Sequence, residues 1–252
     1  MRRVVNILWT GGFDSTYRML ELSRMNVIVQ PYYIKDSTRK SSIYEIRAMD
    51  KIMKWLVNNP LTVAEINPIQ VVDCNGVKPD DEIFEAYNNL FNKYKLGTQY
   101  EFLARFAKQA GLKLEVGLEC SPRSKAFTTL NCEAKLMIFK EDDYSVYVLD
   151  KEKSSKDIVL LFENILVPTT LFHMSKLDEL AAYKAKGAEV LVKMTHFCHN
   201  PTWGGYPCGQ CNPCKDALNE GMEFRVPIID RILGFMRKAF YYIGHKIKNI
   251  DR

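Results

Sequence analysis

The chain has 252 residues, of which 47% are hydrophobic and 26% are charged, and its formal net charge is +5 at pH 7. This length suits either one large α/β domain or one domain with a small appendage, and the core can be sizeable. No apolar run reaches the ~18 residues of a membrane span, and the N-terminus lacks a secretory hydrophobic segment. We therefore expect a cytoplasmic protein without a membrane partner.

The first predicted unit is a buried strand over residues 4–9, followed by the turn Gly11-Gly12. Asp14, Ser15 and Thr16 can cap a helix that runs to about residue 25. Paired glycines let backbone NH groups approach an anion, and the positive end of a helix favours phosphate. This stretch predicts a nucleotide-phosphate site. A plain strand-turn-helix connection with capping residues is the alternative.

The heptapeptide of residues 10–16, Thr-Gly-Gly-Phe-Asp-Ser-Thr, carries a resemblance to a known superfamily. It is similar to the Ser-Gly-Gly-x-Asp-Ser signature of the PP-loop ATP pyrophosphatases, which are adenylating enzymes. Thr10 stands where that signature has its first serine, so a hydroxyl is retained. The resemblance implies that the loop holds ATP.

The next elements alternate in the way expected of an α/β fold. Apolar patterns predict a strand over residues 27–34, a helix over 43–58, a strand over 69–73, a helix with its buried face over 83–94 and a strand over 113–118. Gly97 and Thr98 stand directly before a further helix. In PP-loop enzymes a turn of this kind lines the ATP site, whereas a simple helix cap is the alternative.

Residues 140–164 depart from this alternation. The apolar stretches 144–149 and 157–162 flank the polar residues 151–156, which is the pattern of a β-hairpin. We interpret it as an insertion or an edge hairpin. It would cover either the active site or an oligomer interface.

The segment that follows predicts another helix start. Ser175 with Asp178 or Glu179 makes a good cap, and Gly187 is a good stop. Lys176 falls in the first turn, where the helix dipole disfavours a cation unless a phosphate or carboxylate offsets it. Lys176 is therefore a candidate catalytic residue, with a solvated lysine as the alternative.

Four of the seven cysteines cluster near the C-terminus and predict a metal site: Cys198, Cys208, Cys211 and Cys214. Four thiolates complete a tetrahedron and leave no open position for water, which favours structural Zn²⁺. An iron–sulfur cluster uses similar spacings and is the alternative. His196 and His199 flank Cys198 and rank second as ligands.

The cysteine run, Thr-x-x-Cys followed by Cys-Gly-x-Cys-x-x-Cys, closely resembles the zinc segment of the 7-cyano-7-deazaguanine synthases of queuosine biosynthesis. The loop, the Gly97 turn, Lys176 and the cysteines follow that family's order. The resemblance implies a Rossmann-like (adenine nucleotide alpha hydrolase-like) parallel sheet with flanking helices. It also implies Asp14, Ser15 and Lys176 as catalytic residues, with ATP held by Leu8, Thr10, Gly11, Gly12, Asp14, Ser15, Thr16, Gly97 and Thr98. Magnesium would bridge the phosphates, with Asp14 as a direct or water-mediated partner.

The activity implied is that of an ATP-dependent C–N ligase. It would convert a small-molecule acid, 7-carboxy-7-deazaguanine or an analogue, with ammonia to an amide and then a nitrile. Residues 35–40, Lys-Asp-Ser-Thr-Arg-Lys, replace a Gly-Gln-Arg-His-like patch of that family, which leaves room for a paralogue acting on another acid, such as a protein carboxylate. A tRNA-thiolating enzyme is disfavoured because Cys74, Cys120 and Cys132 form no paired motif. A zinc-stapled nucleotide-binding module without catalysis is the third alternative.

We divide the chain into an ATP-binding domain, residues 1–190, and a zinc-binding segment with a C-terminal helix, residues 191–252. Residues 231–252 carry six Lys or Arg against one Asp, which gives +5 and leaves the remaining chain close to neutral. On an amphipathic helix such charge is usually a solvated face, so nucleic acid is not expected as a partner. The apolar face of this helix packs on its own domain or on the second subunit of a homodimer: Ile229, Ile232, Leu233, Met236, Phe240, Ile243 and Ile247.

Overall fold

The computed structural model describes residues 2–36, 39–118, 120–121 and 123–237. They form an α/β fold around a mostly parallel sheet with the strand order β3-β2-β1-β5-β8-β7-β6, in which β4 also pairs with β2. The parallel strands are β1 (Arg3–Leu8), β2 (Val27–Lys35), β3 (Glu65–Ile66), β4 (Gln70–Asp73), β5 (Leu114–Val116) and β8 (Ile165–Pro168). The antiparallel strands β6 (Leu136–Glu141) and β7 (Tyr144–Leu149) extend the sheet beyond β8.

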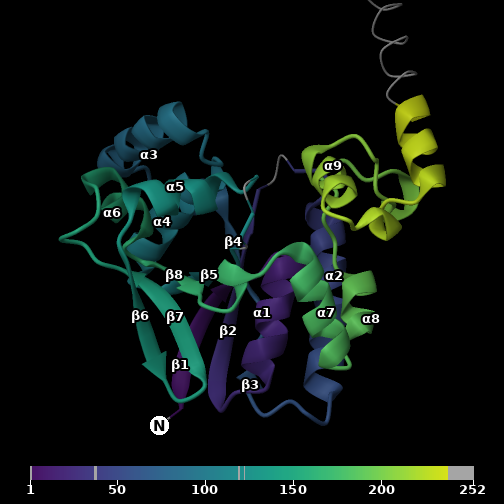
Figure 1. Cartoon of the computed structure of the whole chain (residues 1–252), viewed down its shortest axis with the longest axis horizontal. Coiled ribbons are helices and arrows are strands. Elements are labelled where there is room, and N and C mark those ends of the chain that lie inside the picture. Colours follow the sequence, from purple (N-terminus) through teal and green to yellow (C-terminus); the bar gives the residue numbers. More distant parts are fainter. Residues whose placement is uncertain (1, 37–38, 119, 122, 238–252) are drawn as a thin grey trace, which may run out of the picture.

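Helices cover both faces of this sheet (Figure 1). One face carries α1 (Phe13–Ser23), α2 (Ser42–Asn58), α7 (Lys176–Ala185) and α8 (Glu189–Met194). The other carries α3 (Asp81–Tyr94), α4 (Gln99–Ala110), α5 (Lys125–Glu133) and α6 (Lys156–Phe162). A hydrophobic core lies on each face of the sheet, because successive side chains of a strand point to opposite faces. In β1, Val5 and Ile7 pack with the first set of helices and Leu8 packs with the second.

A buried ion pair joins α1 to the centre of the sheet. The Arg18 guanidinium donates from Nε to Glu115 Oε2 at 2.7 Å and from Nη2 to Glu115 Oε1 at 3.2 Å. Both side chains are at most 1% exposed, and Nη1 of Arg18 also donates to Glu21 at 3.2 Å. This bidentate pair fixes the position of α1 against β5, and therefore the position of the loop that precedes α1.

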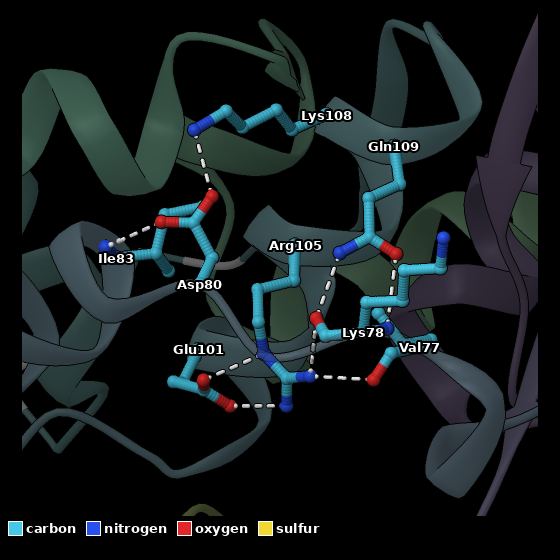
Figure 2. A network of polar contacts seen from close by, with 8 residues as sticks. All are labelled: Val77, Lys78, Asp80, Ile83, Glu101, Arg105, Lys108 and Gln109. Atoms are coloured by element: carbon cyan, nitrogen blue, oxygen red, sulfur yellow. Dashed lines mark hydrogen bonds and ion pairs between the residues drawn. The ribbon is translucent and has the colours of Figure 1, made fainter.

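A polar network holds α4 against the segment that leads into α3 (Figure 2). Arg105 binds both carboxylate oxygens of Glu101, at 2.6 and 2.8 Å, and donates to the carbonyl oxygens of Val77 and Lys78. Asp80 caps α3 through the backbone NH of Ile83. These contacts fix the start of α4, which the Gly97 turn precedes.

The elements predicted up to residue 118 are present, with ends that differ by no more than two residues. The cap of α7 is also confirmed, since Ser175 and Asp178 form a capping box. The strands β3, β6 and β8 and the helices α5, α8 and α9 (Asn212–Asn219) were not predicted.

The predicted hairpin is wrong in its second half. Residues 157–162 lie in the helix α6, whose start is capped by Ser155. Ile158, Leu161 and Phe162 are its buried residues, a helical spacing that short apolar runs share with strands. The real hairpin joins β6 to β7 through Asp142, whose φ of 50° is a conformation that Asp tolerates.

The C-terminal segment shares its hydrophobic core with the α/β fold. Cys198, Cys208, Cys214, Met222 and Val226 belong to the same buried cluster as α1 and α2. Residues 228–237 are helical, and the predicted apolar residues Phe240, Ile243 and Ile247 lie outside the described residues.

Apolar side chains of this helix are exposed rather than packed on its own domain. The exposed set is Ile228, Ile229, Ile232, Leu233, Phe235 and Met236. The opposite side of the helix touches the metal segment, because a Cβ on Gly234 would clash with the backbone of Cys208. Within the described ranges, no helix is both long and apolar enough to cross a bilayer.

We expect Glu115→Gln to lower the free energy of unfolding by about 3–5 kcal/mol, because it breaks the buried pair and leaves the Arg18 charge under-compensated. Urea denaturation followed by circular dichroism measures the loss. Lys151→Gln is the matched control, since Lys151 pairs with Glu163 on the surface and is 58% exposed, so a loss below about 1 kcal/mol is expected. Equal losses in the two variants would contradict this role of the Arg18–Glu115 pair.

Candidate functional site

A pocket of about 370 Å³ lies where β1 ends and α1 begins. Its walls come from several separate parts of the chain. Most of the lining comes from the turn after β1 with the start of α1, from residues 196–199, and from the helix α9 (Asn212–Asn219) with the segment that ends in the short η4 turn (Glu223–Arg225). The start of α7, the start of α4, residues 123–124 and residues 39 and 45 complete it. The pocket is therefore assembled by the tertiary fold.

The backbone of the loop after β1 requires glycine at its first turn position. Gly11 has a φ of 67°, and a Cβ there would lie 3.0 Å from Met49 Cγ and 3.1 Å from the Glu45 carbonyl oxygen. Gly12 is the N-cap of α1, and no side chain of the described residues caps this helix end. The first NH groups of α1 are thus left for a group from outside the helix.

The loop is held by backbone contacts from distant segments. His196 N donates to Gly11 O at 2.9 Å, which joins the loop to the segment that leads to the cysteines. Gly117, directly after β5, lies so close to α1 that its Cβ would be 3.1 Å from Ser15 N. The ends of β1 and β5 therefore meet at the start of α1.

Asp14 and Lys176 contact each other in the lining of the pocket. Asp14 lies in the first turn of α1, and Lys176 is the first residue of α7, so both side chains project from helix N-termini. Their carboxylate and ammonium groups form an ion pair, and Lys176 Nζ lies 3.8 Å from the buried Glu179 carboxylate. Carboxylates thus offset the positive charge of Lys176 at this helix end. The alternative of a solvated lysine does not apply, because the Lys176 side chain is only 15% exposed.

The residues predicted to hold ATP do not all meet here. Among the described residues, Thr10, Gly12, Asp14 and Lys176 line the pocket. Ser15 lies beside it, with its hydroxyl 3.5 Å from that of Thr10.

Other predicted residues serve elsewhere in the fold. Thr16 is fully buried, and its hydroxyl accepts a hydrogen bond from Trp9 Nε1 at 3.1 Å. Leu8 packs in the core on the other face of the sheet. Gly97 and Thr98 are exposed outside the pocket, and the next residue, Gln99, lines it instead.

Several pocket residues were missed by sequence reasoning. Glu45 is buried and accepts hydrogen bonds from Tyr33, Ser41 and Arg39, and the last of these, at 2.7 Å, anchors the polar segment before α2. Glu220 lines the opposite wall, where burial raises the pKa of its carboxyl group. No periodicity or motif in the sequence marks these residues. The one available signal was the position of Glu45 on the buried face of a predicted helix, where a charged residue is unusual.

Arg225 is a further missed residue, and it is enclosed by aromatic rings. Its guanidinium carbon lies 4.3 Å from the ring centre of Phe197 and 5.2 Å from that of Phe13. Burial lowers the pKa of this guanidinium to about 10, so it stays charged at neutral pH.

The four predicted cysteine ligands are brought together. The sulfur atoms of Cys198, Cys208, Cys211 and Cys214 all lie within 4.8 Å of one another. The Cys211 sulfur is 3.8 Å from that of Cys198 and 3.4 Å from that of Cys214. Tetrahedral zinc with Zn–S bonds of about 2.3 Å would place sulfurs about 3.8 Å apart, so the group fits a metal ion such as zinc.

Backbone geometry supports this ligand set. The NH of Cys208 points to the Cys198 sulfur at 3.2 Å, and the NH of Cys211 points to the Cys208 sulfur at 3.4 Å. Cys211 is also the N-cap of α9, where the helix dipole favours thiolate. His196 and His199 lie outside the four-residue group, in agreement with their lower rank, and His196 Nε2 instead contacts the Cys198 carbonyl oxygen at 2.8 Å.

No protein-family model matches the chain, and the search of curated proteins gives no match either. The functional interpretation therefore depends on the geometry and chemistry of the described residues.

We predict one zinc ion per folded chain and a poor soluble yield for Cys211→Ser. A structural zinc site contributes on the order of 10 kcal/mol, which becomes folding free energy when the ligands meet only in the folded chain. Cys132→Ser is the matched control and should be nearly neutral, because Cys132 is exposed and outside the group. Elemental analysis and soluble yield measure both effects. Iron with sulfide in place of zinc, or a metal-free chain that folds normally, would contradict the assignment.

Proposed function

We propose that the protein is an ATP-dependent adenylating enzyme of the PP-loop type that forms a C–N bond. The observation that carries the proposal is the Gly11–Gly12 loop, which leaves the N-terminus of α1 open to the pocket with Asp14 and Lys176 beside it. A helix N-terminus without a side-chain cap favours an anionic ligand, and a lysine next to it favours phosphate.

The sheet topology supports a Rossmann-like interpretation. From β1 the parallel sheet continues through β2 to β3 and β4 on one side, and through β5 to β8 on the other. The direction in which successive strands are added to the sheet therefore reverses between β1 and β5. Ligands of such sheets bind at the carboxyl ends of the strands next to this point, which is where the loop and Gly117 lie.

In the proposed ATP complex, the loop would take the phosphates. The NH groups at the start of α1, the Ser15 hydroxyl and Lys176 would hold the charge that develops on the departing pyrophosphate. Magnesium bound to the phosphates would neutralise part of that charge, and Asp14 would be its partner directly or through water. ATP and Mg²⁺ would then loosen the Asp14–Lys176 pair, since each side chain gains a ligand of opposite charge.

The reaction proceeds in two transfers. An acceptor carboxylate oxygen attacks the α-phosphorus of ATP, the bond to the bridging oxygen breaks, and pyrophosphate leaves. Ammonia then attacks the acyl carbon, AMP leaves, and the nitrogen loses a proton. Glu220 lines the pocket and is the proposed acceptor of that proton, and burial raises the pKa of its carboxyl group above its usual value.

The amide so formed is the first product. A second ATP can adenylate the amide oxygen, and loss of AMP with a proton from nitrogen then gives the nitrile. The acid is 7-carboxy-7-deazaguanine or an analogue, or a protein carboxylate in a paralogue. Zinc at the four cysteines would stabilise the wall of the pocket and supply no step of the chemistry.

Two alternatives share the same loop. A tRNA-thiolating enzyme needs a reactive cysteine in the pocket, and among the described residues Cys74, Cys120 and Cys132 do not line it. A nucleotide-binding module without catalysis needs only the loop and the metal. The products of ATP turnover separate these alternatives from the proposal.

With its acid and ammonia, the protein should cleave ATP between the α and β phosphates and release AMP and pyrophosphate. A mass-spectrometric screen of candidate acids with ATP, Mg²⁺ and ammonia measures both the nucleotide and the amide. Formation of ADP and orthophosphate alone would contradict adenylation. If no acid in the screen gives AMP while ATP still binds, the non-catalytic module is favoured.

Asp14→Ala should reduce turnover at least a hundredfold, because one partner of the phosphate and magnesium site is lost, while the protein stays folded. Asp157→Ala is the matched control, since Asp157 occupies the first turn of α6 and lies outside the pocket. Steady-state AMP formation and thermal melting are measured for both. Near-normal turnover of Asp14→Ala would make the loop a structural connection.

A further inference from the structure

The basic side chains of the pocket differ in how their charge is balanced. Four Lys or Arg residues line it within the described ranges. Three have an acidic partner, as Lys176 contacts Asp14, Arg39 lies 2.7 Å from Glu45, and Arg123 lies 3.7 Å from Asp216. The fourth, Arg225, forms no ion pair with any described residue. Its charge is attracted by Asp14 and Glu179 only at longer range.

Arg225 is held rigidly even so. Its Nη2 donates to Thr195 Oγ1 at 2.6 Å, and the Thr195 hydroxyl in turn donates to the Val192 carbonyl oxygen at 2.9 Å. The rings of Phe13 and Phe197 lie next to the guanidinium plane. These contacts fix the orientation of the group and engage only part of its five donors.

A cation in this setting is costly without an anion. Burial removes water from the guanidinium, and aromatic rings return only part of the lost solvation. Phe13, one of the two rings next to the guanidinium, is the first residue of α1 and directly follows Gly12. The guanidinium therefore lies beside the open N-terminus of α1. The same corner of the pocket therefore presents a helix end and a planar donor fork.

We propose that Arg225 is the oxyanion-binding residue of this pocket. The guanidinium fork fits a carboxylate or a phosphate in a bidentate manner, which a lysine does not. Two sources of that chemistry enter the pocket in the proposed reaction, namely the polyphosphate of ATP and the carboxylate of the acceptor. The assignment rests on the proposed function for the identity of the ligand only, because anion binding is measured without turnover.

The test compares wild-type protein with Arg225→Met and Arg225→Lys in two binding measurements. Calorimetry with α,β-methylene-ATP and Mg²⁺ reports the polyphosphate, and adenosine serves as the ligand without phosphate. Thermal stabilisation by acetate, against chloride at equal ionic strength, reports a carboxylate. Arg24→Met is the matched control, because Arg24 is similarly half-buried but donates to the Lys186 carbonyl oxygen outside the pocket.

If the polyphosphate is the ligand, we expect Arg225→Met to weaken the binding of α,β-methylene-ATP at least tenfold and to leave the binding of adenosine unchanged. If a carboxylate is the ligand, we expect Arg225→Met to abolish the thermal stabilisation by acetate. Arg225→Lys should retain part of the anion binding in either case, because lysine keeps the positive charge but lacks the guanidinium fork. A lower melting temperature with both anion measurements unchanged in Arg225→Met would make Arg225 a structural group and overturn the proposal. Anion binding that depends on Arg225 without AMP formation would overturn the proposed function and leave this assignment standing.

Discussion

The pocket depends on a backbone conformation that favours glycine. Gly11 turns the chain with a positive φ at a point where Met49 and the Glu45 carbonyl leave no room for a side chain. That turn directs the N-terminus of α1 towards the ends of β1 and β5. The buried Arg18–Glu115 pair then holds α1 at this angle, and His196 fastens the loop from the other side. Strain or a bulky residue at Gly11 would move every polar group that the loop presents.

The metal segment and the pocket share one hydrophobic core. Cys198 and Cys214 pack in the cluster that contains α1, and His196, which lies two residues before Cys198, donates a backbone hydrogen bond to Gly11. The helix α9 begins at the Cys211 cap and carries Asp216 and Glu220 into the pocket region. A metal that orders the cysteines therefore also orders one wall of the site.

Local patterns in the sequence predicted the parts of the site that come from contiguous residues. The Gly11–Gly12 turn, the Ser175 cap and the four cysteines each have a physical reason within a few residues, and the structure places them as that reason requires. Glu45, Glu220 and Arg225 could not be found this way, because each reaches the pocket through tertiary packing and lies in no motif. The Gly97 turn shows the converse error, since a likeness in order along the chain placed Gly97 and Thr98 at a pocket that Gln99 lines.

The same distinction explains the hairpin. The apolar residues within 157–162 suit either a strand or a short helix, and in the structure Ser155 caps a helix there. Residues 136–141 are largely exposed on an edge strand, so they carry no alternation of buried and polar positions that would mark them. A strand that buries neither face, such as β6, therefore leaves no hydrophobic pattern from which it could be predicted.

Charge balance in the pocket gives the last constraint on its ligand. Lys176, Arg39 and Arg123 are each compensated by an acid of the chain itself, so an incoming anion must compete with Asp14, Glu45 or Asp216 for them. Arg225 faces no such competition among the described residues, and Thr195 holds its fork in place before a ligand arrives. Preorganised donors cost least when the anion binds. An anion that enters this pocket therefore meets its strongest unopposed attraction at the corner formed by Arg225, Phe13 and the start of α1.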